Sequence, residues 1–184
     1  MTADERREQI LDAATSAFAE HGYAGTTTDE VARAAGVSQP YVVRLFGSKH
    51  DLFAAVFERI GNEIVASFEQ VAPGPDAARD LGDVYVRLLS DRDKLRVLMH
   101  GFVAGADPTF GSQARRTLVR AFEIFQELTG QDDEAARNFV AAGMLINVLL
   151  AAEAPEHADE HGVGDLLVCA VGPDAAAELI GAAA

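Results

Sequence analysis

The stretch TTTDEVARAAGVSQPYVVRLFGSKHDLF, residues 26–53, contains the signals for three successive helix starts. Thr27 stands three residues before Glu30, which is the spacing of a capping box. In that arrangement the threonine hydroxyl and the glutamate carboxylate each accept from a backbone N–H group that has no other partner. Gly36 can close this first short helix, because glycine adopts the left-handed conformation without a steric penalty.

The next two helix starts follow at once. Ser38 can cap a second short helix with its hydroxyl, and Pro40 suits the first turn because the amides there lack intrahelical acceptors. Ser48 stands three residues before Asp51 and predicts a third helix over LFAAVFERI. Two short helices joined by a glycine-containing turn match a helix-turn-helix, whose second helix enters the major groove of DNA.

The second of these helices, residues 39–46, carries a predicted orientation. Val42, Leu45 and Phe46 have the spacing of one helical face, so we expect them to point inward. The other side chains are expected at the N-terminal tip, on the flanks or on the opposite face, where such helices touch base edges. These side chains are Gln39, Pro40, Tyr41, Val43 and Arg44.

The composition is that of a globular chain with a sizeable core. It has 184 residues, of which 49% are hydrophobic and 24% are charged, and this suits one or two compact domains. The N-terminus has no apolar run, and no stretch reaches about eighteen uninterrupted apolar residues, so we expect a cytoplasmic protein without a membrane segment. The single cysteine, Cys169, lies in the apolar run DLLVCAV and is expected to be a buried thiol.

The overall charge does not favour DNA binding by itself. The net charge is −14, whereas Lys and Arg side chains supply most non-specific affinity for phosphates. Residues 1–60 hold six basic and nine acidic side chains, and the remainder holds nine and twenty. The acidic excess therefore lies mainly outside residues 1–60, which is compatible with a localised contact surface.

Helical patterns continue along the whole chain, and no β-run or internal repeat competes with them. Residues 4–21 predict an amphipathic first helix that ends at Gly22, and apolar residues at 3–4 spacing predict a long helix to about residue 70. Pro73-Gly74-Pro75 marks the clearest boundary. We therefore predict an all-α fold of about nine helices, with a helix-turn-helix domain over 1–48, a connecting helix over 49–72 and an antiparallel bundle over 76–184.

Aspartates predict where the helices of that bundle begin. Asp76 is expected to cap one helix, Asp91 or Asp93 the next, and Asp132 or Asp133 a later one. Asp107-Pro108 is expected to end a helix before another over residues 112–129.

The helix ARNFVAAGMLINVLLAAEA, residues 136–154, is apolar nearly all round, so it must be covered on every side. A second copy of the chain could cover it, since the small residues around Gly143 allow another helix to approach. We therefore predict a homodimer, and the alternative is a central core helix in a monomer. The expected interface residues are Phe139, Gly143, Ile146, Asn147 and Leu150.

Polar side chains within the apolar helices of the bundle are candidates for a ligand pocket. The candidates are Tyr85, Arg96, His100 and Asn147, with Met99, Phe102 and Met144 as possible walls. A single His or Asn on a helix is more often hydrogen-bonded within the core, which is the competing interpretation. The apolar surroundings favour a hydrophobic or aromatic ligand. His157 and His161 have i, i+4 spacing but are more simply read as part of a solvated connection than as a metal site.

The first sixty positions resemble the DNA-binding domain of the TetR family of bacterial transcriptional regulators. The resemblance rests on ILDAATSAFAEHGYAGTTTDEVA, then ARAAGVS, an aromatic-ended recognition helix and SKHDLF. It implies a homodimer that binds double-stranded operator DNA, usually represses, and is released by a small molecule bound in the C-terminal bundle. An enzyme is a further alternative, but no nucleophile, base and orienting group stand at motif spacing, so we expect neither enzyme activity nor a cofactor.

Residue by residue, the resemblance implies phosphate contacts from Thr26 or Thr27 and from Lys49. Lys49 stands at a helix N-terminus, where a cation opposes the helix dipole unless an anion such as phosphate is bound. Gln39, Pro40, Tyr41 and Arg44 are implied to lie at the groove, where Arg44 could pair with guanine or clamp a phosphate.

The recognition helix departs from the family pattern at two positions. A tyrosine is common where this chain has Val43, and a histidine or tyrosine where it has Leu45. Tyr41 could replace the missing aromatic contact, while Pro40 and Val43 could meet thymine methyl groups. The alternative is a ligand-binding or interaction module whose DNA-binding head has degenerated.

Overall fold

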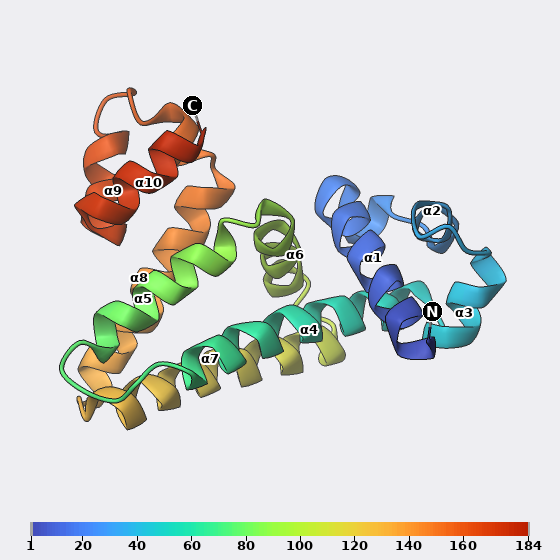
Figure 1. Cartoon of the computed structure of the whole chain (residues 1–184), viewed down its shortest axis with the longest axis horizontal. Helices are drawn as coiled ribbons and strands as arrows, with labels where there is room; N and C mark the ends of the chain where they lie inside the picture. The colour runs from blue at the N-terminus through green and yellow to red at the C-terminus, as the bar shows by residue number, and fades with distance from the viewer. Residues whose placement is uncertain (1, 184) are drawn as a thin grey trace.

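The computed structural model describes residues 2–183, which form ten α-helices and one 3₁₀ helix and contain no strand. A head of three helices at one end is joined by a long helix to a larger helical body at the other (Figure 1). The helices are α1 (Ala3–Gly25), α2 (Thr28–Ala34), α3 (Gln39–Phe46), α4 (Lys49–Glu69), α5 (Ala77–Leu89), α6 (Arg92–Val103), α7 (Pro108–Thr129), α8 (Asp133–Ala151), η1 (Ala154–His157), α9 (Val163–Val171) and α10 (Pro173–Ala183). The predicted all-α architecture is thus confirmed.

The caps of the head follow the sequence with one exception. The backbone N–H of Glu30 donates to Thr27 Oγ1 (3.2 Å), and that of Thr27 donates to Glu30 Oε2 (3.4 Å), so the capping box is present. Ser48 Oγ accepts from the N–H of Asp51 (3.1 Å). Ser38, however, makes no side-chain cap. Pro40 has no N–H to donate in the first turn of α3, and the next N–H, that of Tyr41, goes to the Ser38 carbonyl (2.9 Å).

The first helix is longer than predicted because it is kinked rather than ended at Gly22. That glycine has φ 67° and ψ 177°, and a further helical turn reaches Gly25. The His100 ring of α6 packs at the kink, 3.5 Å from where a Cβ on Gly22 would stand. The kink is therefore a contact between the head and the body.

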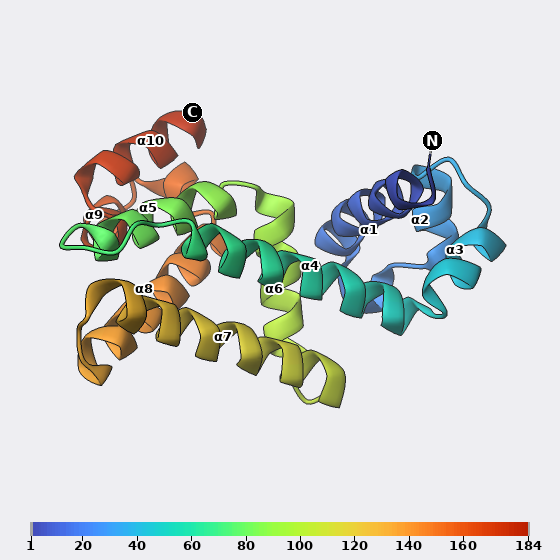
Figure 2. The same ribbon diagram turned by 60° about the horizontal axis from the view of Figure 1, so that its bottom comes forward.

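Helix α4 connects the head to the body, and it is long, as its apolar spacing predicts. It leaves the head and runs side by side with α7 through the body (Figures 1 and 2). At the junction, the ring of Phe53 meets the rings of Phe18, Tyr23 and Phe110 at centroid distances of 4.9, 5.3 and 4.9 Å. The head and the body therefore share one continuous hydrophobic core.

Two helix starts in the body differ from expectation. Asp76 is in an α-helical conformation and makes no side-chain cap. Helix α7 begins at Pro108 rather than at residue 112, because the Asp107 carboxylate accepts from the N–H groups of Thr109 (2.9 Å) and Phe110 (3.3 Å). The sequence at Asp107-Pro108 is thus a helix start, with proline in the first turn where its missing N–H costs nothing.

The C-terminal segment contains one helix more than predicted. Gly172 (φ 82°) separates α9 from α10, and Pro173 opens the second of them. The resulting short helix α9 leaves Cys169 exposed, so the prediction of a buried thiol is wrong. The cause is that α9 has a narrow contact face, in which Leu167 is the buried residue.

Helix α8 is covered on one side only. Ile146, Asn147 and Leu150 are buried within the chain, whereas Leu145 and Val148 are 39% and 52% exposed. Among the described residues α8 is the one helix long and apolar enough to cross a membrane by length and composition, a property shared by core helices of soluble proteins. Its exposed apolar side is a surface that the chain itself leaves open.

Candidate nucleic-acid interface and helical-body cavity

Helix α3 exposes most of the residues that were expected to face outward. Pro40, Val43 and Arg44 are exposed, and Gln39 and Tyr41 are partly buried at the edge of the head. Val42 is fully buried and Phe46 half-buried, as predicted, but Leu45 is 39% exposed. The prediction for Leu45 is wrong because α3 is short and meets the head mainly through residues one full turn apart.

Gln39 at the tip of α3 is tied to the start of α2. Its Nε2 donates to Thr28 Oγ1 (3.2 Å), which joins the first turns of the two helices. Thr28 was not among the predicted site residues, although it stands beside the capping threonine in the run TTT. The contact holds the Gln39 side chain at the N-terminal end of α3, where base edges are contacted in helix-turn-helix proteins.

Arg44 lies against Tyr41 on the outer side of the same helix. The guanidinium carbon is 4.9 Å from the centroid of the Tyr41 ring, a cation–π geometry that limits the freedom of both side chains. Both remain accessible, so the pair forms a small platform with a planar donor on an aromatic ring.

The two threonines implied as phosphate contacts have different environments. Thr26 is fully buried, and its hydroxyl lies within hydrogen-bonding distance of the carbonyls of Ala17 (3.0 Å) and Gly22 (2.8 Å). Thr26 therefore cannot touch DNA and stabilises the end of α1. Thr27 is exposed, and its hydroxyl hydrogen is still available to a phosphate because the cap uses only the oxygen as an acceptor.

Lys49 has internal partners that the sequence did not suggest. Its Nζ donates to the carbonyls of Tyr23 (2.9 Å) and Ala24 (3.3 Å) and lies 4.8 Å from the Tyr23 ring centroid. The ammonium thus stabilises the C-terminal end of α1, where free carbonyls favour a cation. A bound anion is consequently not required to explain a lysine at the start of α4.

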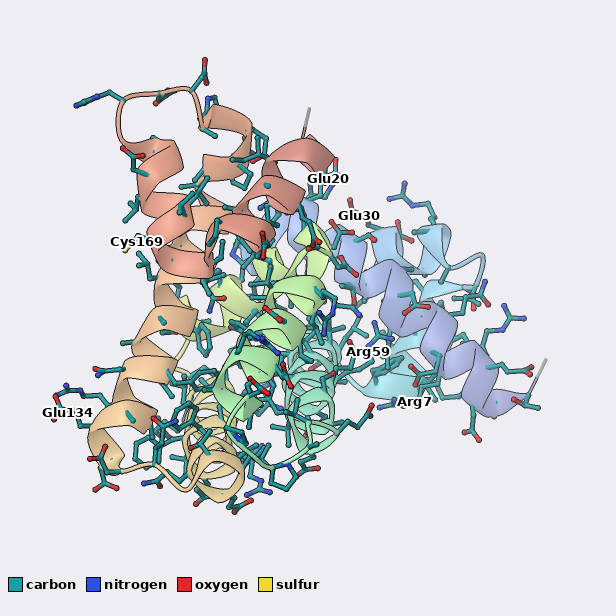
Figure 3. All side chains as sticks on the ribbon, turned by 60° about the vertical axis from the view of Figure 1, so that its left-hand side comes forward. Arg7, Glu20, Glu30, Arg59, Glu134 and Cys169 are labelled. Carbon is teal, nitrogen blue, oxygen red and sulfur yellow. The ribbon has the colours of Figure 1, made fainter. Side chains whose placement is uncertain are left out.

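No unpaired basic patch stands out in the described part of the head. His21 lies 2.9 Å from Glu30, and Arg33 lies 3.1 Å from Asp29. At the junction of α1 and α4, Arg59 reaches back to α1 (Figure 3), where its guanidinium donates to Asp12 Oδ1 (2.8 Å). The exposed groups of α3 and Thr27 are therefore the candidates for contacts with DNA that have no acidic partner among the described residues.

The body contains a small apolar cavity of about 40 Å³. Three of the residues expected to bind a ligand line it, namely Tyr85, Phe102 and Met144. No charged side chain is among its described lining residues, which are Ile64, Phe68, Tyr85, Leu98, Phe102, Thr117, Leu118, Ala121, Phe139, Val140, Gly143 and Met144.

The other expected pocket residues point elsewhere. Arg96 is exposed and lies 3.4 Å from Glu153, and His100 packs on Gly22 of α1. Met99 packs against the core without lining the cavity. Helical spacing alone does not distinguish the face of α6 that meets the cavity from the face that meets α1.

Tyr85 and Asn147 form a polar pair beside the cavity. The Tyr85 hydroxyl donates to Asn147 Oδ1 (2.8 Å), and Asn147 is fully buried. Burial raises the pKa of Tyr85 to about 12, and the hydrogen bond to Asn147 lowers it by a smaller amount. The phenol is therefore neutral at physiological pH.

The residues predicted for the dimer interface lie mostly inside the chain. Ile146, Asn147 and Leu150 are buried, while Phe139 and Gly143 line the cavity. The prediction selected the wrong side of α8, because its apolar pattern continues round the helix and does not identify the side that other helices cover. The exposed side instead presents Ala141, Leu145 and Val148.

The two C-terminal histidines do not meet. His157 ends η1 and its Nδ1 lies 3.2 Å from Glu160, whereas His161 is exposed in the loop that follows. The described residues contain no group of three or more His, Cys, Asp and Glu side chains placed to hold a metal.

Comparison with known proteins identifies the head. A family model described as "Bacterial regulatory proteins, tetR family" matches residues 10–56, which span most of α1, then α2, α3 and the start of α4. The transcriptional activator FasR of Mycolicibacterium smegmatis is 42% identical over 67 residues, which are 36% of this chain and 31% of that protein. A transcriptional repressor of Mycobacterium tuberculosis is 33% identical over 102 residues, 55% of this chain and 51% of that protein.

The chain thus spans between about a third and a half of these curated relatives, while solved structures match it over nearly its whole length. A TetR-like transcriptional regulator from Rhodococcus sp. RHA1 is 27% identical, with a TM-score of 0.70 over 98% of this chain and 93% of that chain. The likeness therefore includes the helical body as well as the head.

Proposed function

The chain belongs to the TetR family of bacterial DNA-binding regulators, and on that premise we propose that it is a cytoplasmic transcriptional repressor that binds a near-palindromic operator as a homodimer. The protein is thus a regulator and not an enzyme. The observation that carries the proposal is the capped head, which leaves Gln39, Pro40, Val43 and Arg44 accessible on α3. In a helix-turn-helix these are the positions that reach base edges.

The proposed contacts differ in kind. Arg44 supplies a planar guanidinium for guanine or for a phosphate, and Gln39 supplies an amide at the tip of the helix. Pro40 and Val43 supply apolar contacts for thymine methyl groups. Thr27 supplies a phosphate contact from the start of α2. The Tyr41 ring packs against the Arg44 guanidinium and so restricts its orientation. Lys49 takes part only where DNA competes with the carbonyls at the end of α1.

The direct test is binding of the purified protein to DNA fragments that flank its own coding sequence. We expect a nanomolar dissociation constant for one near-palindromic fragment and a steep loss of affinity as salt rises. A fragment of the same length with scrambled half-sites is the matched control. Failure to bind any flanking fragment at low salt, with or without candidate ligands, contradicts the proposal.

The proposed dimer uses the side of the molecule where α8 is open. Ala141, Leu145 and Val148 of α8 are exposed there, as are Leu166 and Cys169 of α9. In Figure 3, Glu134 at the start of α8 and Cys169 on α9 both lie along the same outer edge. Burying this apolar edge against its copy would remove from water the largest exposed aliphatic side chains of α8 and α9.

The proposed repressor is released by a small apolar effector in the cavity of the body. Helix α6 supports this, because Leu98 and Phe102 line the cavity while His100 packs on the kink of α1 at Gly22. A ligand that displaces α6 would therefore change the support of the head. Adding an effector should lower affinity for the operator without lowering the helix content.

A second candidate function is a ligand-binding or interaction module with a degenerate head. Two observations favour it, namely the internal pairing of Lys49 and the absence of an aromatic side chain at Val43. A protein that dimerises and binds ligands yet shifts no DNA fragment would support this candidate over the repressor.

A further inference from the structure

Two cavities meet at Tyr85. The inner cavity of about 40 Å³ lies among α4, α5, α6, α7 and α8, and a groove of about 210 Å³ lies between α5, α8 and α9. Tyr85, Phe139 and Gly143 line both spaces. These three residues are therefore the partition between the inner cavity and the groove.

The inner cavity is too small for a ligand while the partition stays in place. A cavity of about 150 Å³ holds a single benzene molecule, and ligand pockets commonly measure about 300–1,000 Å³. The two spaces together approach the lower end of that range. The inner cavity must therefore enlarge to receive a ligand, and the partition toward the groove is one place where it can do so. A second groove borders the inner cavity at Leu118 and Val140.

Tyr85 is less firmly held than Phe139, because among the described ring contacts Tyr85 has one, with Phe68 at 5.8 Å, whereas Phe139 has two. Phe139 is held between Phe68 and Phe125, with ring centroids 5.8 and 4.8 Å away. Gly143 has no side chain that could move, and its backbone lies beside the Tyr85 ring, since a Cβ there would stand 3.4 Å from Tyr85 Cε1. The hydrogen bond to Asn147 (2.8 Å) is the one polar contact that holds this ring closed in the described structure.

Opening Tyr85 would leave Asn147 without its donor. Asn147 is fully buried, and its Nδ2 has only a weak contact with Met144 Sδ (3.7 Å). A buried carbonyl oxygen without a donor is costly, so a ligand that brings its own O–H group is favoured over a hydrocarbon of equal size. A carboxylate is disfavoured, because the described lining of the inner cavity offers no cation, and Arg79 in the groove already lies 3.2 Å from Asp80.

We propose that Tyr85 is a gate and that the ligand admitted by it is an uncharged phenol. The ring of the ligand takes the space that the Tyr85 ring vacates among Phe68, Phe102 and Phe139, and its hydroxyl donates to Asn147 Oδ1. The proposal rests on the proposed function only in calling this ligand the effector. The site itself is defined by the two cavities and by the Tyr85–Asn147 pair.

The test is calorimetric titration of the full chain with three probes of matched shape, 4-ethylphenol, ethylbenzene and 4-ethylbenzoate. We expect 4-ethylphenol to bind about 5- to 150-fold more tightly than ethylbenzene, which corresponds to supplying one buried hydrogen-bond donor. We expect no binding of 4-ethylbenzoate over the same concentrations. Absence of 4-ethylphenol binding, equal affinity for ethylbenzene, or preference for the benzoate overturns the proposal.

Two substitutions separate the gate from the site. Tyr85→Phe keeps the ring and removes the hydroxyl that donates to Asn147. Affinity for 4-ethylphenol should therefore rise several-fold, because the conformation in which the Tyr85 ring fills the site is weakened. Asn147→Leu removes the acceptor, so the preference for 4-ethylphenol over ethylbenzene should fall to near unity. Tyr23→Phe makes the same chemical change in the head and should alter neither the affinity for 4-ethylphenol nor the affinity for ethylbenzene. An unchanged affinity in Tyr85→Phe overturns the gate, even if Asn147→Leu fails to fold.

DNA binding is measured in a separate experiment, so failure of the phenol site can be distinguished from failure of the proposed repressor function. If the protein binds its operator but not 4-ethylphenol, the phenol site is wrong and the repressor stands. If 4-ethylphenol binds with the expected preference but leaves operator affinity unchanged, the site stands and its role as the effector site is wrong.

Discussion

Arg44 is the side chain whose loss should affect DNA recognition most at the residue scale. Its guanidinium is exposed and lies against the Tyr41 ring, so Arg44→Ala removes the proposed base or phosphate contact without disturbing the core. We expect operator affinity to fall about 5- to 150-fold, the equivalent of about 1–3 kcal/mol, with an unchanged unfolding midpoint. Arg44→Lys should restore charge but not bidentate pairing, and fluorescence anisotropy with labelled operator distinguishes them. Unchanged affinity in Arg44→Ala would remove Arg44 from the interface.

Lys49 is expected to stabilise the head whether or not DNA is present. Lys49→Met keeps most of the aliphatic stem but removes the donor to the carbonyls of Tyr23 and Ala24. The free energy of unfolding should fall by about 1 kcal/mol, measured by urea denaturation in the absence of DNA. Arg33→Met on the surface of α2 is the control and should change it by less than about 0.5 kcal/mol. Equal free energies of unfolding for the two variants would mean that Lys49 does not stabilise the head, and phosphate binding would remain as its role.

At the scale of the element, α6 can pack closely against α4 because Gly101 has no side chain. A Cβ placed on Gly101 would overlap the ring of Phe57 on α4, and Gly101 is buried. Gly101→Ala should therefore lower the free energy of unfolding by about 1–3 kcal/mol through overpacking. Gly82→Ala is the matched control, because a Cβ there meets nothing within 4 Å, and it should raise stability by about 0.5–1 kcal/mol. Thermal and urea unfolding of both variants check the opposite signs.

The elements that the sequence predicted well are those whose signal is local. The capping box at Thr27 and the long apolar period of α4 depend on residues a few positions apart, and both are present. The sequence does not identify the partners in long-range contacts. Lys49 meets the end of α1 and Asn147 meets Tyr85, and these partners lie 26 and 62 positions away.

The candidate site shows the same division between local and tertiary information. The outer residues of α3 followed from helical geometry, whereas the burial of Thr26 and the exposure of Leu45 depend on which helices surround them. A pattern that is apolar on all sides, as in α8, gives no information on which side faces the chain's own core. The sequence therefore predicted which residues α3 exposes, but it did not predict which side of α8 the chain itself covers.

At the scale of the whole molecule, the exposed side of α8 should hold two copies together. Leu145 and Val148 are 39% and 52% exposed, and charges placed there would have to be buried in a dimer without partners. We expect the double variant Leu145→Glu, Val148→Glu to elute as one chain of 19.5 kDa in light scattering at micromolar concentration, while the wild type has twice that mass. Val103→Glu places a charge at an 84% exposed position on α6 and should remain dimeric.

The proposed dimer also determines how the head would work, because two half-sites of an operator are read together when two heads are held at a fixed spacing. The double variant should therefore lose the high affinity for the near-palindromic fragment while keeping weak binding to a single half-site, as a gel-shift series over protein concentration can show. A wild type that scatters as a single chain at micromolar concentration would contradict the dimer. Tight operator binding by a monomeric double variant would show instead that one head is enough.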